Sequence, residues 1–276
     1  MIKNLIAEHY MSKKKNSNGF IMNKSSTNSG LLNFFERIIR SHPLLYVLVR
    51  YFVRYTNIFE EDAVGVKYIN FNNKINIIDV GASDGIASKF FINNLNVNKS
   101  ICFEPNNFYV KILKKIKKNN LIIRPYAIGH KKNTKEIFFP RYKFFNINFD
   151  LIPYTYYNKS TLAKQLKLDF RFRKNIRIIK QKLRINKVNN LKYKIDLIKI
   201  DVNDNGLSVV KCLERIIKKD QPALLIETDS DIKKIIRILK KYKYNKYAFS
   251  NKKNKFEKIN NKFPLNTYFL REKHLS

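Results

Sequence analysis

The sequence predicts an α/β fold in which a mostly parallel sheet is covered by helices on both faces. From Ile75 onward, apolar runs of strand length alternate with segments of helical periodicity. Short polar signals stand where the predicted strands end, which is where such sheets bind their ligands. At 276 residues and 44% hydrophobic content, the chain is long enough for one domain with an ample core.

The core elements are expected in a regular order. Apolar runs predict strands over 75–80, 100–105, 121–129, 193–202 and 222–229, and closing strands over 242–250 and 266–272. Amphipathic spacing predicts helices over 86–95, 107–120, 207–219 and 231–242. In the second of these helices, the spacing places Phe108, Ile112 and Ile116 on one face. A sheet built by this alternation is mostly parallel.

Other segments stand apart from this alternation. Residues 1–30 are polar and predict a flexible basic arm, and 31–60 predict N-terminal helices, with Pro43 opening the second. These helices would pack on the core or lie on a membrane surface, because they are too short and too charged to span a bilayer. Residues 64–71 predict a short strand at the start of the main domain, 61–276, and 140–180 predict an irregular insertion within it.

The formal charge is +35, from 56 basic and 21 acidic residues. One interpretation is a surface for a polyanion such as nucleic acid or anionic lipid. The favoured one is a compositional bias, because lysines are spread along nearly the whole chain. Cys102 and Cys212 lie in apolar runs and are expected to be buried thiols, which indicates a cytoplasmic compartment. Peripheral attachment at the inner face of the membrane stays open.

The segment 77–85, IIDVGASDG, ends the first core strand in a glycine loop with two incompatible interpretations. Its last five residues match G-x-S-x-G, the turn that presents a serine nucleophile. They also form a short loop suited to cradling a nucleotide cofactor at a helix N-terminus. A hydrolase of this kind needs a histidine after its catalytic acid. Only His130 and His274 lie downstream of Ser83; His130 precedes the acidic strand ends, and His274 lies near the C-terminus. The cofactor loop is therefore favoured, although G-x-G-x-x-G fails because Ser83 occupies its third position.

Acidic residues stand at the ends of several other predicted strands. Glu104 ends the second strand, 25 residues after Asp79, while Asp201 and Glu227 end the fourth and fifth. A carboxylate at the position of Glu104 can accept both hydroxyls of a ribose. The structural alternative is an exposed glutamate before a proline turn.

These stretches resemble the class I S-adenosylmethionine-dependent methyltransferases, and among them the FkbM family. The resemblance rests on IIDVGASDG, CFEP, YAIG and IDLIKIDVNDNGLSVVKC, with PALLIETD behind them, and it covers roughly residues 60 to 270. It implies a Rossmann-like, mostly parallel seven-stranded sheet and S-adenosylmethionine as the cofactor, with no metal.

The resemblance also implies roles for individual residues. Asp79, Gly81, Ala82, Ser83 and Gly85 would hold the methionine end of the cofactor. Glu104 would bind its ribose, and Pro105 and Asn106 would shape the edge of the adenine site. Ala127 and Ile128 would pack near the adenine, and Asp201 would sit beside the transferable methyl group.

Methyl transfer to an oxygen requires alignment of the acceptor and a base for its proton. The candidate bases are Asp201, Asp204, Glu227 and His130, in that order. Structural alternatives stay open: either aspartate could cap the following helix, Glu227 could be a structural carboxylate, and His130 could be an exposed loop residue. The family pattern D-V-E-G-x-E continues here as DVNDNG, 201–206.

The expected function is an O-methyltransferase that acts on a hydroxyl of a saccharide, surface polysaccharide or glycolipid precursor, as the resemblance implies. The aromatic and basic insertion 140–180 would form the wall for this small-molecule or glycan acceptor, or else carry a small core of its own. Two alternatives remain. The charge favours methylation of RNA, and the changed DVNDNG motif favours a catalytically altered member that serves as an interaction or membrane-surface module.

Overall fold

The computed structural model describes residues 42–45, 47–48, 61–151, 154–171, 173–188, 191–203, 205–260 and 262–275. They fall into two compact units, one comprising Phe59–Thr134 and Leu183–Ser276, and a smaller one that includes Lys135–Lys182. The arm expected over 1–30 lies outside the described residues, as does most of the helical segment expected over 31–60. The helical residues that are described there begin at Pro43, as the sequence predicts.

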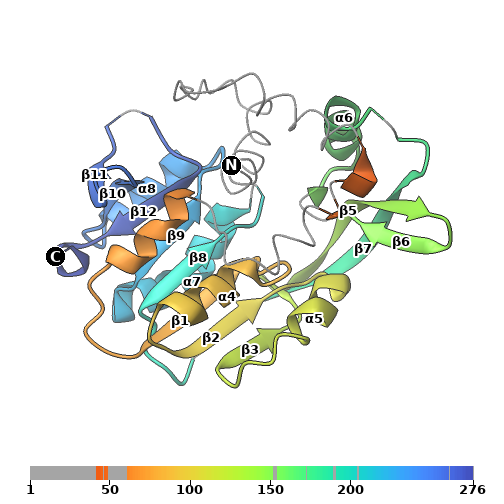
Figure 1. Ribbon diagram of the computed structural model, residues 1–276. Helices are drawn as coiled ribbons and strands as arrows, with labels where there is room; N and C mark the ends of the chain where they lie inside the picture. Colours follow the sequence, from red (N-terminus) through yellow and green to blue (C-terminus); the bar gives the residue numbers. More distant parts are fainter. Residues whose placement is uncertain are drawn as a thin grey trace. The chain divides into compact units, whose positions relative to one another are not determined.

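The larger unit is built on an eight-stranded sheet of order β11-β10-β12-β9-β8-β1-β2-β3 (Figure 1). Its strands are β1 (Ile75–Val80), β2 (Val97–Phe103), β3 (Leu121–Arg124), β8 (Leu197–Ile200), β9 (Ala223–Glu227), β10 (Asn245–Ser250), β11 (Lys255–Lys258) and β12 (Asn266–Leu270). The α/β class is confirmed, but the expected count of seven strands is wrong by one. The additional strand, β11, reads KFEK, and such a short, charged edge strand lacks the apolar run that predicted the others.

The order of the strands creates a ligand-binding position. Strands β3, β2, β1, β8 and β9 pair in parallel, and β12, β10 and β11 extend the sheet through antiparallel pairs. The chain runs from β1 outward to β3 and later resumes with β8 on the other side of β1. This reversal makes a topological switch point between β1 and β8. Ligands of open α/β sheets bind there, outside the carboxyl ends of the strands.

Helices cover both faces of this sheet, as the sequence predicts. One face carries η1 (Glu61–Tyr68), α4 (Ile86–Asn94) and α5 (Asn107–Leu113), and the other carries α7 (Gly206–Asp220) and α8 (Ile232–Lys240). A short helix, η3 (Glu272–His274), follows β12. Neighbouring residues of a strand point to opposite faces, so Ile77 packs with the first group and Ile78 with the second. Because both faces are covered, β1 is buried along its whole length.

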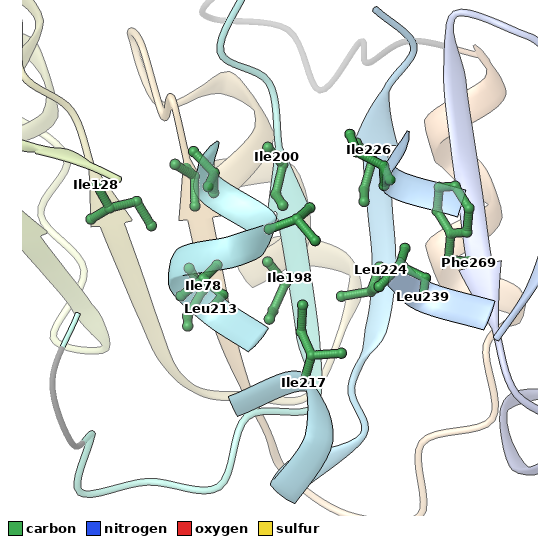
Figure 2. Close-up of a cluster of buried hydrophobic side chains, with 14 of the residues drawn as sticks. Ile78, Ile128, Ile198, Ile200, Leu213, Ile217, Leu224, Ile226, Leu239 and Phe269 are labelled. Carbon is green, nitrogen blue, oxygen red and sulfur yellow. The ribbon is translucent and has the colours of Figure 1, made fainter. Parts of the chain in front are cut away.

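The largest cluster of buried side chains lies between the sheet and helices α7 and α8 (Figure 2). Ile198 and Leu224 contribute from adjacent strands, and Leu213 and Ile217 contribute from α7. These two α7 residues are four apart, so they lie on one helical face. Each fully buried aliphatic side chain of this kind contributes about 1.5–3 kcal/mol relative to exposure. The cluster thus fixes α7, which begins directly after the loop at the end of β8.

Two local expectations are wrong. Residues 64–71 were expected to form a strand, but η1 occupies most of them, because Ala63, Val66 and Ile69 are buried at a spacing of three, the period of a 3₁₀-helix. In the helix expected over 107–120, the buried residues are Tyr109, Val110 and Leu113 rather than the face through Phe108, Ile112 and Ile116, and α5 ends at Leu113.

The segment expected to be irregular, 140–180, contains regular elements instead. A second sheet of order β4-β7-β5-β6 is formed by β4 (Ala127–Ile128), β5 (Asn133–Phe144), β6 (Ile147–Asp150) and β7 (Ile176–Asn186). The apolar run 121–129, expected to form one strand, is therefore divided between β3 and β4. Along β7, exposed Lys182 and Arg184 alternate with buried Leu183 and Ile185. This is the period-two pattern of a strand with one solvent face, which a search for continuous apolar runs does not detect.

The smaller unit has its own core. Tyr142 on β5, Tyr154, and Leu162 on α6 (Lys159–Asp169) are buried together with Phe170. These aromatic residues form a small core of their own, which is one of the two interpretations of the 140–180 insertion. Leu44 and Val47 from the N-terminal segment pack against the same cluster. Across the described ranges, no helix combines the length and apolarity needed to cross a membrane.

Candidate functional site

The loop from β1 to α4 has a backbone that favours glycine at two points. Gly81 and Gly85 have φ values of 78° and 81°, and Ser83 between them has φ 51°. A Cβ on Gly81 would collide with the backbone carbonyl oxygen of Asp201. The loop is thus pressed against the end of β8, and a side chain at Gly81 would push the two apart. This explains the concentration of glycine in a chain with only 7 glycines.

Glu104, at the end of β2, ties this loop to the next one. Its Oε2 accepts a hydrogen bond of 2.8 Å from the N–H of Ser83, and its Oε1 accepts one of 2.8 Å from the N–H of Asn106. The residue is 5% exposed, and burial raises the pKa of its carboxyl to about 7 against the lowering effect of these bonds. A carboxylate offers about four lone-pair positions, so each oxygen can accept one further donor.

Asn106 supplies a donor beside these acceptors. Its Oδ1 accepts the N–H of Phe108 and caps α5, whereas its Nδ2 has no hydrogen-bond partner among the described residues. Asn106 is 2% exposed, and a buried donor without a partner is costly. A ligand acceptor at Nδ2 would remove that cost. The acceptor capacity of Glu104 and the donor of Asn106 therefore suit a ligand that carries both hydroxyls and acceptor atoms.

A buried lysine, Lys199, joins the carboxylates of Asp79 and Asp201, and these three side chains form a charge network next to the loop. Lys199 on β8 is paired in register with Asp79 on β1, and its Nζ lies 3.7 Å from Asp79 Oδ1 and 3.1 Å from Asp201 Oδ2. The side chains of Lys199 and Asp79 are 4% and 0% exposed, whereas that of Asp201 is 32% exposed. Burial raises the pKa of the Asp79 carboxyl, and the Lys199 ammonium opposes this. The network carries a net negative charge that reaches the surface at Asp201 when both carboxyls are ionised.

Lys199 is a site residue that the motifs of the sequence do not single out. Its signal is visible in retrospect, since IIDV and LIKI each place one charged residue at the third position of a four-residue apolar run. A charge in a strand covered on both faces needs an opposite charge nearby. The adjacent parallel strand provides it.

Ser88 and Cys102 continue the network on the face covered by α4. Ser88 Oγ donates a 2.5 Å hydrogen bond to Asp79 Oδ2, and its oxygen lies 2.9 Å from Cys102 Sγ. Because the Ser88 proton goes to Asp79, the Cys102 thiol donates to Ser88 Oγ. Burial raises the pKa of that thiol to about 12, which keeps it protonated. Both cysteines are free, as expected, although Cys212 is only half-buried.

We expect Cys102 to be inert toward thiol reagents in the native protein. Reactivity follows the thiolate, and this thiol is both buried and held protonated. In a Cys212→Ala variant, a chromogenic disulfide reagent at pH 8 should give less than a tenth of the colour obtained after unfolding in guanidinium. Full reaction of the native variant within minutes would contradict the buried Cys102–Ser88–Asp79 chain.

The other residues predicted at the cofactor site have varied surroundings. Ala82 is buried with Cys102 and Leu113, and Pro105 is half-buried between Glu104 and α5. Ala127 is half-buried on β4, whereas Ile128 is 1% exposed within the core cluster of Figure 2. Their predicted contacts with an adenine stay predictions.

The predicted bases are distributed over separate strand ends. Asp201 reaches the surface beside the glycine loop, and Glu227 is half-buried at the end of β9. His130 is exposed, and Asp204 lies outside the described residues. The N-cap of α7 is Asn205, so Asp201 pairs with Lys199 rather than capping that helix. Of the described candidates, only Asp201 belongs to the charge network.

Comparison with known proteins decides the family. A model of the FkbM methyltransferase domain matches residues 79–246, more than half of the chain. The chain belongs to the FkbM methyltransferase family. The matched range runs from Asp79 to β10 and thus contains the glycine loop, Glu104 and the charge network. No curated protein sequence matches the chain.

Solved structures similar to this FkbM protein are methyltransferases with low sequence identity. A methyltransferase FkbM from Methylobacillus flagellatus KT shares 12% identity with a TM-score of 0.46, over 87% of this chain and 58% of that one. A precorrin-6y C5,15-methyltransferase from Geobacter metallireducens GS-15 shares 12% identity with a TM-score of 0.39, over 78% of this chain and 89% of that one. TrmK of M. capricolum, solved with S-adenosylhomocysteine, shares 11% identity with a TM-score of 0.39, over 80% of this chain and 72% of that one. The chain thus spans 58% of the length of the Methylobacillus protein.

The raised pKa of Glu104 gives this FkbM protein a specific pH dependence. The pKa of this carboxyl in the folded state, about 7, lies above its ordinary value of 4.5, so the folded state holds this proton more tightly than the unfolded state. Glu104 therefore stabilises the fold below about pH 4.5, and this contribution, roughly 3 kcal/mol, is lost as the pH rises through 7. His274, whose pKa is lowered to about 4, acts in the opposite direction over part of the same range.

The difference between wild type and Glu104→Gln isolates this effect, because His274 titrates in both. Urea unfolding from pH 4.5 to 8 should show the wild type losing roughly 3 kcal/mol relative to the variant. A difference in the free energy of unfolding that stays constant over this range would show that Glu104 titrates normally.

Proposed function

We propose that this chain is an S-adenosylmethionine-dependent O-methyltransferase that methylates a hydroxyl of a saccharide, a surface polysaccharide or a glycolipid precursor. The observation that carries the proposal is the pair formed by Glu104 and Asn106 at the carboxyl end of β2, the strand next to β1. Each Glu104 oxygen can accept one further hydrogen, and the Asn106 amide can donate one. Family membership supplies the reaction class.

The residues present fit an adenosine cofactor. Glu104 would accept the ribose hydroxyls, and Asn106 Nδ2 would donate to an acceptor at the edge of the adenine site. Gly81 and Gly85 have no side chains, so at these two positions a ligand carboxylate can approach the backbone N–H groups ahead of α4 closely. When bound, the cofactor supplies a methyl group on a positively charged sulfur.

The charge network would act on that positive charge. When both carboxyls are ionised, Lys199 offsets one of the two negative charges, and the partly exposed end of this group lies at Asp201. A cation near Asp201 is therefore attracted, and the attraction weakens once the charge is lost. Asp201 is also the described candidate best placed to take the proton of an acceptor hydroxyl, because its carboxylate is partly exposed at the strand end. Asp79 supports the loop from beneath, through Ser88 and Lys199.

The acceptor class rests on the family. A hydroxyl acceptor fits a site that offers a partly exposed carboxylate as base. Tyr142, Tyr154 and Phe170 are buried in the core of the smaller unit, so these three aromatic side chains do not supply the acceptor wall that the sequence predicts.

Transfer of a labelled methyl group tests the proposal. We expect the full chain, incubated with methyl-labelled S-adenosylmethionine and a panel of glycans and lipid-linked sugars, to form one S-adenosylhomocysteine per methyl ether. Asp201→Asn should lower this rate by about 100-fold or more while the cofactor still binds. Label transferred to RNA instead of glycans would favour the RNA alternative. Binding without transfer to any acceptor would favour the non-catalytic alternative.

A further inference from the structure

The turn of the β5–β6 hairpin, in the smaller unit, carries exposed apolar side chains. Phe145 is 82% exposed, and Ile147 is 58% exposed. Together with Leu168, at 64%, they have the highest exposed fractions of any large hydrophobic residue in the described part of the chain, and all three belong to the smaller unit. Turns usually carry polar residues, so an apolar turn of this kind indicates a partner.

The hairpin holds Phe145 outward. Phe144 and Ile147 are the last register pair of β5 and β6, which leaves a two-residue turn, Phe145-Asn146. Phe145 adopts φ 49°, a conformation that favours glycine or asparagine over an aromatic residue. Its ring contacts that of Phe144 edge-on, with centroids 4.8 Å apart, and Phe144 in turn packs against the core of the unit. Phe144, which is anchored in the core, therefore holds the Phe145 side chain in its exposed position.

Basic residues lie along the strand that leads into this turn and on the segment bonded to it. The N–H of Lys143 donates to the carbonyl oxygen of Asn175 at 3.0 Å, which brings Arg173 and Lys174 beside β5. All three basic side chains are exposed. Residues 135–182 contain 12 basic and 3 acidic residues. Two of the acidic ones are already paired, Glu136 with Lys180 and Asp150 with Arg141.

We propose that Phe145, Ile147, Lys143, Arg173 and Lys174, the hairpin patch, dock on an anionic lipid surface. Aromatic and aliphatic side chains at a turn can enter the boundary between headgroups and acyl chains, and lysine and arginine around them are attracted to the negative surface. An RNA partner would use the same charges and could stack on Phe145, but Ile147 would gain little from it. The exposed aliphatic side chain thus favours lipid. This inference does not depend on the proposed methyl transfer.

Vesicle sedimentation of the full chain tests the charge and the apolar turn separately. We expect binding to vesicles of phosphatidylcholine and phosphatidylglycerol, and weak binding to phosphatidylcholine alone. Phe145→Ser with Ile147→Ser, and Arg173→Ala with Lys174→Ala, should each weaken binding by about tenfold. A matched control removes the same charge from exposed residues of the larger unit, Lys117→Ala with Lys118→Ala, and should change binding by less than twofold. Equal losses in all three variants would overturn the proposal, because diffuse charge would then explain the binding.

A tryptophan reporter locates the contact directly, because the chain contains no tryptophan. Phe145→Trp should shift its emission to shorter wavelength with anionic vesicles and be quenched by brominated acyl chains. Tyr68→Trp, 40% exposed in the larger unit, should do neither. Unchanged emission from Phe145→Trp, or a change with single-stranded RNA and none with vesicles, would overturn the lipid assignment.

Discussion

Replacing Lys199 with methionine is expected to lower the free energy of unfolding by about 3–5 kcal/mol. The side chain is 4% exposed, and its ammonium is the cation that faces the fully buried Asp79 carboxylate. Methionine fills similar space but leaves that carboxylate buried and without its counter-charge. The fold can respond by protonating Asp79 or by opening the sheet between β1 and β8, and either response disturbs the glycine loop. Urea unfolding at pH 7.5 gives the free energy.

Two further variants show whether the loss comes from the charge. Lys111→Met removes an exposed lysine from α5 and should change stability by less than about 0.5 kcal/mol. Adding Asp79→Asn to Lys199→Met removes the stranded carboxylate and should recover a large part of the loss, because the two changes act on one pair. If Lys199→Met unfolds at the same urea concentration as the wild type, the buried network does not hold the loop.

Replacing Glu104 with alanine is expected to weaken S-adenosylmethionine binding by about 100-fold or more, since hydrogen bonds to a charged group each contribute about 1.5–3 kcal/mol. The change removes the acceptors that the proposal assigns to the ribose. It also releases the N–H groups of Ser83 and Asn106, so the two loops are no longer joined. Calorimetric titration at pH 8, where the wild-type carboxyl is mostly ionised, measures the affinity.

The stability of the same variant separates binding from folding. Glu104→Ala loses two hydrogen bonds, but it also removes a buried charge. Its free energy of unfolding at pH 8 should therefore change much less than its free energy of binding S-adenosylmethionine. Glu257→Ala, which removes an exposed glutamate from β11, is the matched control and should bind as the wild type does. Unchanged affinity in Glu104→Ala would show that this carboxylate does not contact the cofactor.

The fold class could be predicted because strands buried on both faces leave continuous apolar runs in the sequence, as 75–80 and 223–227 do. Elements with one solvent face leave weaker signals. β7 alternates charged and apolar residues and so lacks a continuous apolar run, and the short apolar segment 64–71, which predicts a strand, is occupied mostly by η1. Short charged β11 was missed because it too lacks an apolar run.

The candidate site was predictable where backbone chemistry constrains residue type. Gly81 and Gly85 adopt positive φ, and Glu104 stands at a strand end. Lys199 was not found, because its role depends on which strand lies beside β8, and the order of strands is a property of the whole sheet. The Asn106 Nδ2, which has no hydrogen-bond partner among the described residues, likewise depends on the packing around α5.

Calorimetric titration of the wild-type chain with S-adenosylmethionine at pH 8 and at pH 6 tests most directly whether Glu104 binds the cofactor. We expect binding with a dissociation constant on the order of micromolar at pH 8, and weaker binding at pH 6 as Glu104 takes up its proton. If the well-folded wild-type protein binds neither S-adenosylmethionine nor S-adenosylhomocysteine at either pH, the proposed cofactor site is wrong.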